Sequence, residues 1–175
     1  MKLGADQIAQ FEAEGYLLLR SVLSDGDLDP IVAEYEEYIA RRADELLVEG
    51  KVTTLYADEP FDRRLVSICR ENNEIYKELD IMHFRGRASF EFLINDNLLD
   101  MVEALVGPEI SCSPIQHTRA KLPSDILCGG DPHVAPWHQD AGVTWEEADP
   151  YFILTVWLPL SPARPENGCL QIMPK

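Results

Sequence analysis

The sequence predicts an α+β fold in which helices come first and β-strands follow. Apolar residues recur at helical spacing over residues 28–47, whereas a period of two takes over from residue 109 onward. Residues 151–160 form an apolar run with the length and composition of a strand, and residues 169–173 begin another. Helices followed by strands, without alternation of the two, favour a sheet or roll that the second half builds and the N-terminal helices cover.

We expect one domain over residues 1–175, helical over 1–108 and β-structured over 109–175. A chain of 175 residues with 46% hydrophobic and 26% charged residues is long enough for one core and is ordinary in composition. Its formal net charge of −16 repels nucleic acid and anionic membranes, so neither is an expected partner. The acidic residues are spread along the chain, which is typical of a solvated surface.

The cysteines and the N-terminus indicate a reduced compartment. The four cysteines include no CxxC pair, which argues against zinc-ribbon and thioredoxin-like sites. An acidic residue, Asp6, precedes any apolar run, so no secretory signal is visible, and no uncharged apolar stretch reaches the ~18 residues of a membrane span. We therefore expect a soluble, cytoplasmic protein whose thiols are free and buried.

Two helices and a short strand are expected in the first 50 residues. Residues 6–14 predict a short helix that Gly15 ends, and residues 16–22 predict a strand. Ser24 or Asp25 can cap the long helix that follows. We interpret the charged residues of this long helix as a solvated face rather than a partner-binding surface. They are Glu34, Glu36, Glu37, Arg41, Arg42 and Glu45.

Two more helices are expected over residues 61–79 and 98–106, the latter capped by Asp96 or Asn97. Between these helices, residues 83–87 form a small basic island in an acidic chain. Two interpretations of this island stay open, namely a surface turn or a rim that holds an anionic substrate or co-substrate.

The β half is expected to begin with a strand over residues 109–121. His117, Arg119 and Lys121 share one face of it, which indicates either a wet cavity or the solvent-facing side of an edge strand. Residues 123–136 are rich in Gly, Asp and Pro and predict a loop that is long enough to be an entrance or a lid.

The loop leads to His138 and Asp140, which stand two residues apart. On a strand, residues i and i+2 point to the same face, so an imidazole nitrogen and a carboxylate oxygen would converge on one point. These two donors, with further positions left open, make up two thirds of the facial triad of non-heme Fe(II) oxygenases. A His-x-Asp tripeptide also arises by chance, so its neighbours must decide.

Several segments accompany the tripeptide in a fixed order, and with them the chain resembles the phytanoyl-CoA dioxygenase family of Fe(II)/2-oxoglutarate oxygenases. The resemblance covers nearly the whole chain. The segments are Lys121-Leu122-Pro123, Pro136-Trp137-His138-Gln139-Asp140, Thr155-Val156-Trp157-Leu158-Pro159-Leu160, and the run from Glu166 to Pro174.

The resemblance implies N-terminal helices packed on an incomplete double-stranded β-helix, the cupin-like jelly roll. It implies that His138 and Asp140 are the first two iron ligands. It also implies that four further side chains belong to the 2-oxoglutarate region: Trp157 packs on the co-substrate, Lys121 supplies cavity charge, and His117 and Gln139 contact the same region.

The family's second iron His and its 2-oxoglutarate-binding Arg lie downstream of the last of these segments. No His follows His138 in this chain. We therefore expect these 175 residues to be the N-terminal portion of a longer oxygenase, inactive and poorly stable alone.

The implied activity is the hydroxylation of a C–H bond in a small organic substrate, with Fe(II), 2-oxoglutarate and O2. Related halogenases need the carboxylate position vacant for chloride, so Asp140 favours hydroxylation. Two alternatives stay open: a cupin-like Zn or Mn enzyme such as a hydrolase, and a non-catalytic module that kept the fold. Neither the substrate nor the oligomeric state is predicted.

Overall fold

The computed structural model describes residues 2–80, 84, 86–114, 116–127, 136–143 and 146–175. Within them the chain forms α-helices and three short 3-10 turns. The helices are α1 (Ala5–Glu14), α2 (Asp25–Val48), α3 (Phe61–Glu71), α4 (Glu74–Glu78), α5 (Arg87–Phe92) and α6 (Asp96–Val106), and the turns are η1 (Asp140–Val143), η2 (Glu146–Ala148) and η3 (Pro165–Asn167).

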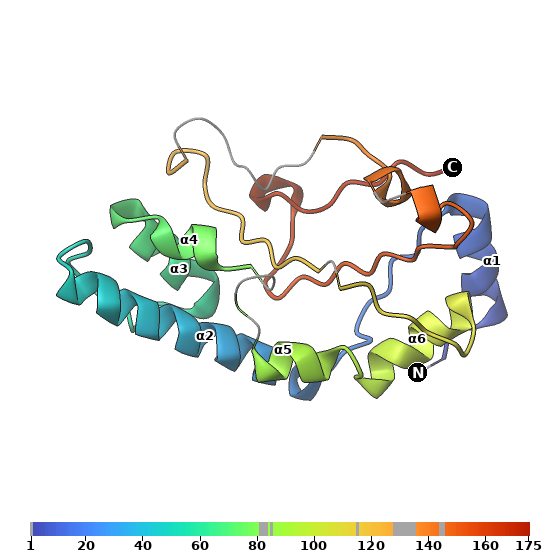
Figure 1. The fold of residues 1–175 in the computed structure, drawn as a ribbon, viewed down its shortest axis with the longest axis horizontal. Helices are drawn as coiled ribbons and strands as arrows, with labels where there is room; N and C mark the ends of the chain where they lie inside the picture. The colour runs from blue at the N-terminus through green and yellow to red at the C-terminus, as the bar shows by residue number, and fades with distance from the viewer. Residues whose placement is uncertain (1, 81–83, 85, 115, 128–135, 144–145) are drawn as a thin grey trace.

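Two extended segments cross the middle of the molecule, with α-helices along one side of them and at both ends (Figure 1). Helix α2 runs along one side and packs against α3, α4 and α5. Helix α1 lies at the end of the molecule that is opposite α3 and α4 (Figure 1). The extended segments are residues 108–121, apart from residue 115, and residues 151–160.

The main core lies between α2, α3 and α4. Helix α2 buries one stripe of side chains at spacings of three and four residues, as an amphipathic helix must. These are Ile31, Tyr35, Ile39, Ala43 and Leu46. The stripe packs with Ile68, Ile75 and Tyr76 of α3 and α4, and the later chain adds Leu122 and Leu127. A smaller cluster joins Leu3 to Leu98 and Met101 of α6.

The predicted fold class, α+β with an incomplete double-stranded β-helix or cupin-like jelly roll, is wrong for this structure. Throughout the residues that the structure describes, no strand or sheet forms. A period of two identifies backbone that favours extension, but a strand also needs a neighbour whose N–H and C=O groups lie in register. Of the 12 prolines, all except Pro30 and Pro60 lie from Pro108 onward, and a proline cannot donate to a ladder. Where the structure describes them, the predicted strands are therefore extended segments that form no β-ladder.

The predicted helix boundaries agree with the structure better than the predicted strands do. Helix α1 ends at Gly15, whose positive φ of 78° suits glycine. Ser24 precedes α2, and its backbone N–H donates to the Asp27 carboxylate at 2.7 Å. The cap of α6 is Asn95, not the predicted Asp96 or Asn97, because the Asn95 side-chain oxygen accepts the Leu98 N–H at 3.0 Å.

The helix predicted over residues 61–79 is two helices. Helix α3 ends at Glu71, and α4 begins at Glu74 after a break at Asn72. Asn72 there takes extended backbone, and its side-chain oxygen accepts the Glu74 N–H at 2.9 Å. Asparagine competes with the helix through such local hydrogen bonds.

Glu34 connects α2 to the beginning of α5. Its carboxylate accepts the backbone N–H groups of Ala88 and Ser89 at 2.7 and 2.9 Å, and the Ser89 hydroxyl at 2.8 Å. Gly86 leaves room for this carboxylate, because a Cβ there would lie 2.0 Å from the Glu34 carboxyl carbon and would force the side chain to move. Partial burial raises the pKa of Glu34, but the hydrogen bonds from Ser89 and Ala88 outweigh burial and hold the pKa below its ordinary value.

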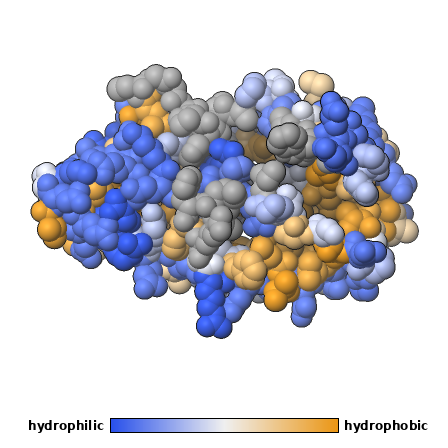
Figure 2. All heavy atoms as spheres, in the orientation of Figure 1, coloured by the Kyte–Doolittle hydropathy of each residue, from blue (hydrophilic) through white to orange (hydrophobic). Residues whose placement is uncertain are grey.

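Polar and apolar surface separate along the molecule. Hydrophilic atoms cover the end that holds α2, α3 and α4, whereas apolar atoms gather over α5 and α6 (Figure 2). Phe90 and Ile94 are among the exposed apolar side chains of that region. In the parts of the chain that can be described, no helix is long and apolar enough to cross a membrane.

Some sequence predictions fall on residues outside the described ranges. His83 and Arg85 of the basic island are among them, as are residues 128–135 of the predicted loop and Cys128. Of the remaining island, Arg87 forms an ion pair with Glu91 at 2.7 Å on the surface of α5. The prediction that the thiols are buried holds for Cys69, whose pKa is raised by burial. It is wrong for Cys112, which is exposed.

Candidate metal-binding site

The imidazole of His138 is held by its own chain. Its Nδ1 lies 2.7 Å from the carbonyl oxygen of Pro136. A carbonyl oxygen can only accept, so Nδ1 carries the proton in the neutral ring and Nε2 keeps its lone pair. A backbone partner of this kind fixes the orientation and the tautomer of the ring, as is usual for metal-bound histidines.

The carboxylate of Asp140 has a separate partner for each oxygen. Its Oδ1 lies 3.2 Å from Nε2 of His138. Its Oδ2 accepts a hydrogen bond from the hydroxyl of Thr155. The carboxylate is therefore oriented with one oxygen beside the free nitrogen of His138 and the other turned to the second extended segment.

A turn, and not a strand, brings the two side chains together. The strand on which the two side chains were expected to share a face does not form; Asp140 is the first residue of η1. The backbone N–H of Gly142 donates to the carbonyl of Gln139 at 2.9 Å and closes this turn. The convergence of His138 and Asp140 that the i, i+2 spacing predicted is thus present, but its cause is the tight bend before η1.

The distance between the two donor atoms suits a metal ion. Two ligand bonds of about 2.1 Å that meet near a right angle separate their donor atoms by about 3.0 Å. The observed distance of 3.2 Å fits neighbouring positions on one ion. The side chains are 40% and 47% exposed, so an ion can reach both from solvent. Within the described ranges, no group of three His, Cys, Asp or Glu side chains could hold a metal, so this pair offers two ligands.

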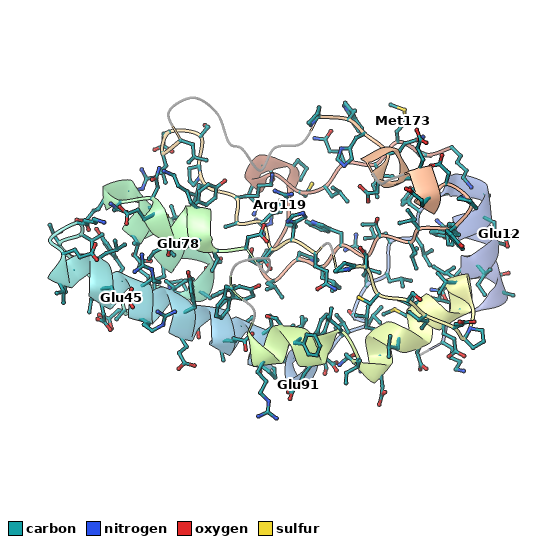
Figure 3. The ribbon with its side chains drawn as sticks, in the orientation of Figure 1. Glu12, Glu45, Glu78, Glu91, Arg119 and Met173 are labelled. Atoms are coloured by element: carbon teal, nitrogen blue, oxygen red, sulfur yellow. The ribbon has the colours of Figure 1, made fainter. Side chains whose placement is uncertain are left out.

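The predicted co-substrate residues of the first extended segment are seen in other contacts. Nδ1 of His117 lies 3.0 Å from the Asp80 carboxylate, just after α4. The aliphatic part of Lys121 runs beside Gly168, where a Cβ would lie 3.7 Å from its Cγ and Cδ. Neither contact involves His138 or Asp140. Arg119, the third residue predicted on that face, lies in the middle of the molecule, whereas Glu12, Glu45 and Glu91 lie on the outer helices (Figure 3).

Gln139 and Trp157 are linked more directly to His138 and Asp140. Gln139 stands between His138 and Asp140, and its side chain is exposed. Trp157 is also exposed and follows Thr155 by two residues in the second extended segment. The hydrogen bond from Thr155 to Asp140 therefore brings this segment to the pair.

Thr155 is a residue to which the sequence assigned no role. It was visible only as part of the Thr155–Leu160 segment. Its signal is that it carries a hydroxyl between Leu154 and Val156, inside an otherwise apolar run. The partner of that hydroxyl lies 15 residues earlier in the chain, so spacing alone could not reveal it.

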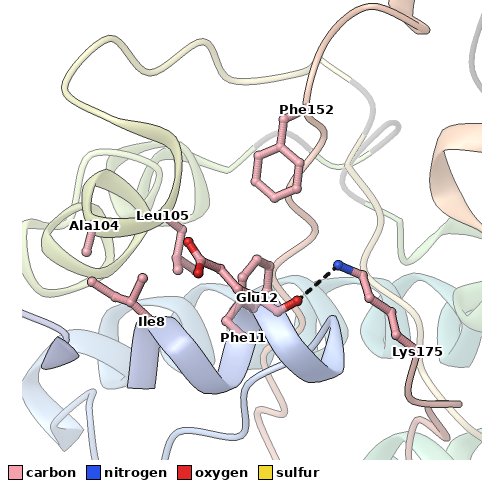
Figure 4. A pocket seen from close by; sticks show the side chains of 7 residues that line it. All are labelled: Ile8, Phe11, Glu12, Ala104, Leu105, Phe152 and Lys175. Atoms are coloured by element: carbon pink, nitrogen blue, oxygen red, sulfur yellow. Dashed lines mark hydrogen bonds between the residues drawn. The ribbon is translucent and has the colours of Figure 1, made fainter. Parts of the chain in front are cut away.

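A separate cleft of about 280 Å³ lies between α1 and α6 (Figure 4). Phe152 closes one side and packs edge-to-face on Phe11, with ring centres 6.2 Å apart. The ammonium of Lys175 donates to the backbone oxygen of Glu12 at 3.3 Å. None of the predicted site residues lines this cleft, so it is not part of the candidate metal-binding site.

An imidazole and a carboxylate presented side by side are the donor types of non-heme iron oxygenases. A family model for phytanoyl-CoA dioxygenase matches residues 11–175, which confirms the resemblance seen in the sequence. The chain belongs to this family of dioxygenases. Comparisons with curated proteins and with solved structures gave no match.

Proposed function

We propose that the protein is an Fe(II)- and 2-oxoglutarate-dependent dioxygenase that hydroxylates a C–H bond of a small organic substrate. The family match over residues 11–175 carries this proposal. The facing Nε2 of His138 and Oδ1 of Asp140 support it, because they are two donors of the kind such an iron needs. When bound, iron with 2-oxoglutarate and O2 supplies the oxidising power for hydroxylation, while 2-oxoglutarate becomes succinate and CO2.

The chain's own residues would hold the metal and leave room around it. His138 offers a ring nitrogen whose orientation the Pro136 carbonyl fixes. Asp140 offers one anionic oxygen and offsets part of the charge of a divalent ion. Because a carboxylate fills that position, chloride has no place there, and we propose hydroxylation rather than halogenation.

We further propose Trp157 and Gln139 as neighbours of the 2-oxoglutarate. Trp157 follows Thr155, which is bonded to Asp140, and Gln139 separates the two proposed ligands. Lys121 is proposed to add positive charge to the co-substrate region, and His117 to lie at its edge. Each of these four assignments rests on the family pattern.

The first prediction concerns Asp140. The change is Asp140→Ala in the full-length protein. Because it removes a proposed anionic ligand, it should abolish product formation and lower 2-oxoglutarate-dependent CO2 release roughly 100-fold or more. The measurement is CO2 or succinate released with Fe(II) against an EDTA-treated control. Asp149→Ala, an exposed Asp of the same region, is the matched control and should retain activity.

Unchanged succinate and product in Asp140→Ala would reject the assignment of Asp140. Activity with Zn or Mn that needs no 2-oxoglutarate would instead favour a cupin-like hydrolase.

A further inference from the structure

We propose that Thr155 is a positioning residue that makes Asp140 bind metal through one oxygen only. The inference rests on the proposed function, because it assumes that Asp140 is a metal ligand. The observation that carries it is the hydrogen bond from the Thr155 hydroxyl to Oδ2 of Asp140, on the opposite oxygen from the one that faces His138.

A carboxylate left to itself can bind a metal through one oxygen or through both. A second bound oxygen would occupy one of the positions that a facial triad keeps open. A hydroxyl donating to Oδ2 competes with the metal for that oxygen's lone pairs and fixes the plane of the carboxylate. Oδ1 is left beside Nε2 of His138 at 3.2 Å, so the pair presents one nitrogen and one oxygen.

Thr155 is well placed for this task because its segment and the ligand turn are separate pieces of chain. The ligands come from residues 138–140, and Thr155 comes from the extended segment at residues 151–160. The hydrogen bond ties the two together across 15 residues. Orienting partners of metal ligands act in this way, and their loss typically weakens metal binding roughly 10- to 100-fold.

The two proposed ligands differ in what holds them. His138 is oriented by the Pro136 carbonyl, a backbone group that every variant keeps. Asp140 is oriented by a side chain that can be replaced by one of nearly equal shape. Valine preserves the branched shape of threonine and removes only the hydrogen bond.

The test is metal affinity without turnover, in the protein as its gene encodes it. Mn(II) is titrated while free Mn(II) is followed by electron paramagnetic resonance, with no 2-oxoglutarate present. Thr155→Val should weaken binding roughly 10- to 100-fold. Thr155→Ser should restore affinity to within about threefold of the unchanged protein, because serine keeps the donor. Thr155→Ala also removes the donor and should weaken binding roughly 10- to 100-fold, and it serves as the test variant if valine disturbs folding.

The chain provides a matched control in Thr53. Its hydroxyl also donates to a carboxylate, that of Glu71 at 2.7 Å, but on the α3 side of the main core. Thr53→Val should leave Mn(II) affinity unchanged. If Thr53→Val weakens binding as much as Thr155→Val, a general loss of structure explains both and the proposal falls.

The remaining outcomes separate the two levels of inference. If Asp140→Ala loses Mn(II) but Thr155→Val binds as the unchanged protein does, Thr155 has no positioning role, and the proposed function stands. If neither His138→Ala nor Asp140→Ala alters Mn(II) binding, the metal site itself is wrong, and the role of Thr155 falls with it.

Discussion

Glu34 lies on the face of α2 that the sequence assigns to solvent, yet its carboxylate is half-buried and receives three hydrogen bonds from the start of α5. An amphipathic pattern shows which face of a helix carries charge. It does not show which carboxylate meets a neighbouring helix, because that depends on where α5 packs. Glu36 and Glu37 of the same helix are exposed, as expected.

Replacement of Glu34 should therefore weaken the fold. Glu34→Ala removes the acceptor for the first N–H groups of α5 and should lower the free energy of unfolding by about 1 kcal/mol, as the loss of a helix cap does. Glu37→Ala, on the exposed side of α2, should change it by less than about 0.5 kcal/mol. Urea unfolding followed by circular dichroism measures both. If both variants lower the free energy of unfolding by the same amount, the contact of Glu34 with α5 does not stabilise the fold.

In the candidate site, as for Glu34, the sequence did not reveal a contact between residues that are distant along the chain. His138 and Asp140 could be found from the sequence because they are two residues apart, a spacing at which a strand or a suitable turn can bring side chains together. Thr155 could not be found, since its contact with Asp140 joins distant positions and depends on the turn at η1. Spacing therefore predicted that His138 and Asp140 converge, and it missed the Thr155 hydroxyl that is hydrogen-bonded to Asp140.

Helices and strands differ in how much of their structure is local. Helix α2 was predictable because its apolar stripe, its Ser24 cap and its hydrogen bonds all lie within one stretch of chain. The segment at residues 151–160 has the composition of a strand, but its pairing partner must come from elsewhere. Composition predicted extended backbone there, and it could not predict that the described chain supplies no ladder.

Helix α2 is tied to its neighbours by two carboxylates whose ionisation matters. The hydrogen bond from Asn95, with others from Ser24 and Asn97, holds the pKa of Asp27 well below its ordinary value of 3.8. The pKa of Glu34 is also lowered, from an ordinary 4.5. The unfolded chain therefore binds protons more tightly at both positions than the folded chain does.

Stability should accordingly fall on acidification. The contribution of both carboxylates is complete above about pH 5 and is lost as the pH falls through their lowered folded values. Urea midpoints measured from pH 7 to pH 3 should decrease. Asp27→Asn should be less stable at pH 7 and should lose less between pH 7 and pH 3. An unchanged pH profile in Asp27→Asn would contradict the assigned role of Asp27. Asp29→Asn, an exposed neighbour, should follow the parent profile.

At the scale of the molecule, burial is unequal between the two halves. The fully buried large side chains, such as Leu46, Ile68 and Tyr76, belong to α2, α3 and α4. Many apolar side chains of the second half are exposed, among them Tyr151 and Met173. Since burial of apolar surface is the main favourable term in folding, the helical half should supply most of the stability.

A pair of leucines tests this inequality with one chemical change. Leu46 has no exposed surface, whereas Leu170 is 52% exposed. Leu46→Ala opens a cavity in the helical core and should lower the free energy of unfolding by about 2–5 kcal/mol. Leu170→Ala leaves no cavity and should lower it by less than about 0.5 kcal/mol. Both are measured by urea unfolding of the same protein at the same pH. Comparable losses would mean that Leu170 is buried in the folded protein, and that the second half is packed into a core as tightly as α2 is.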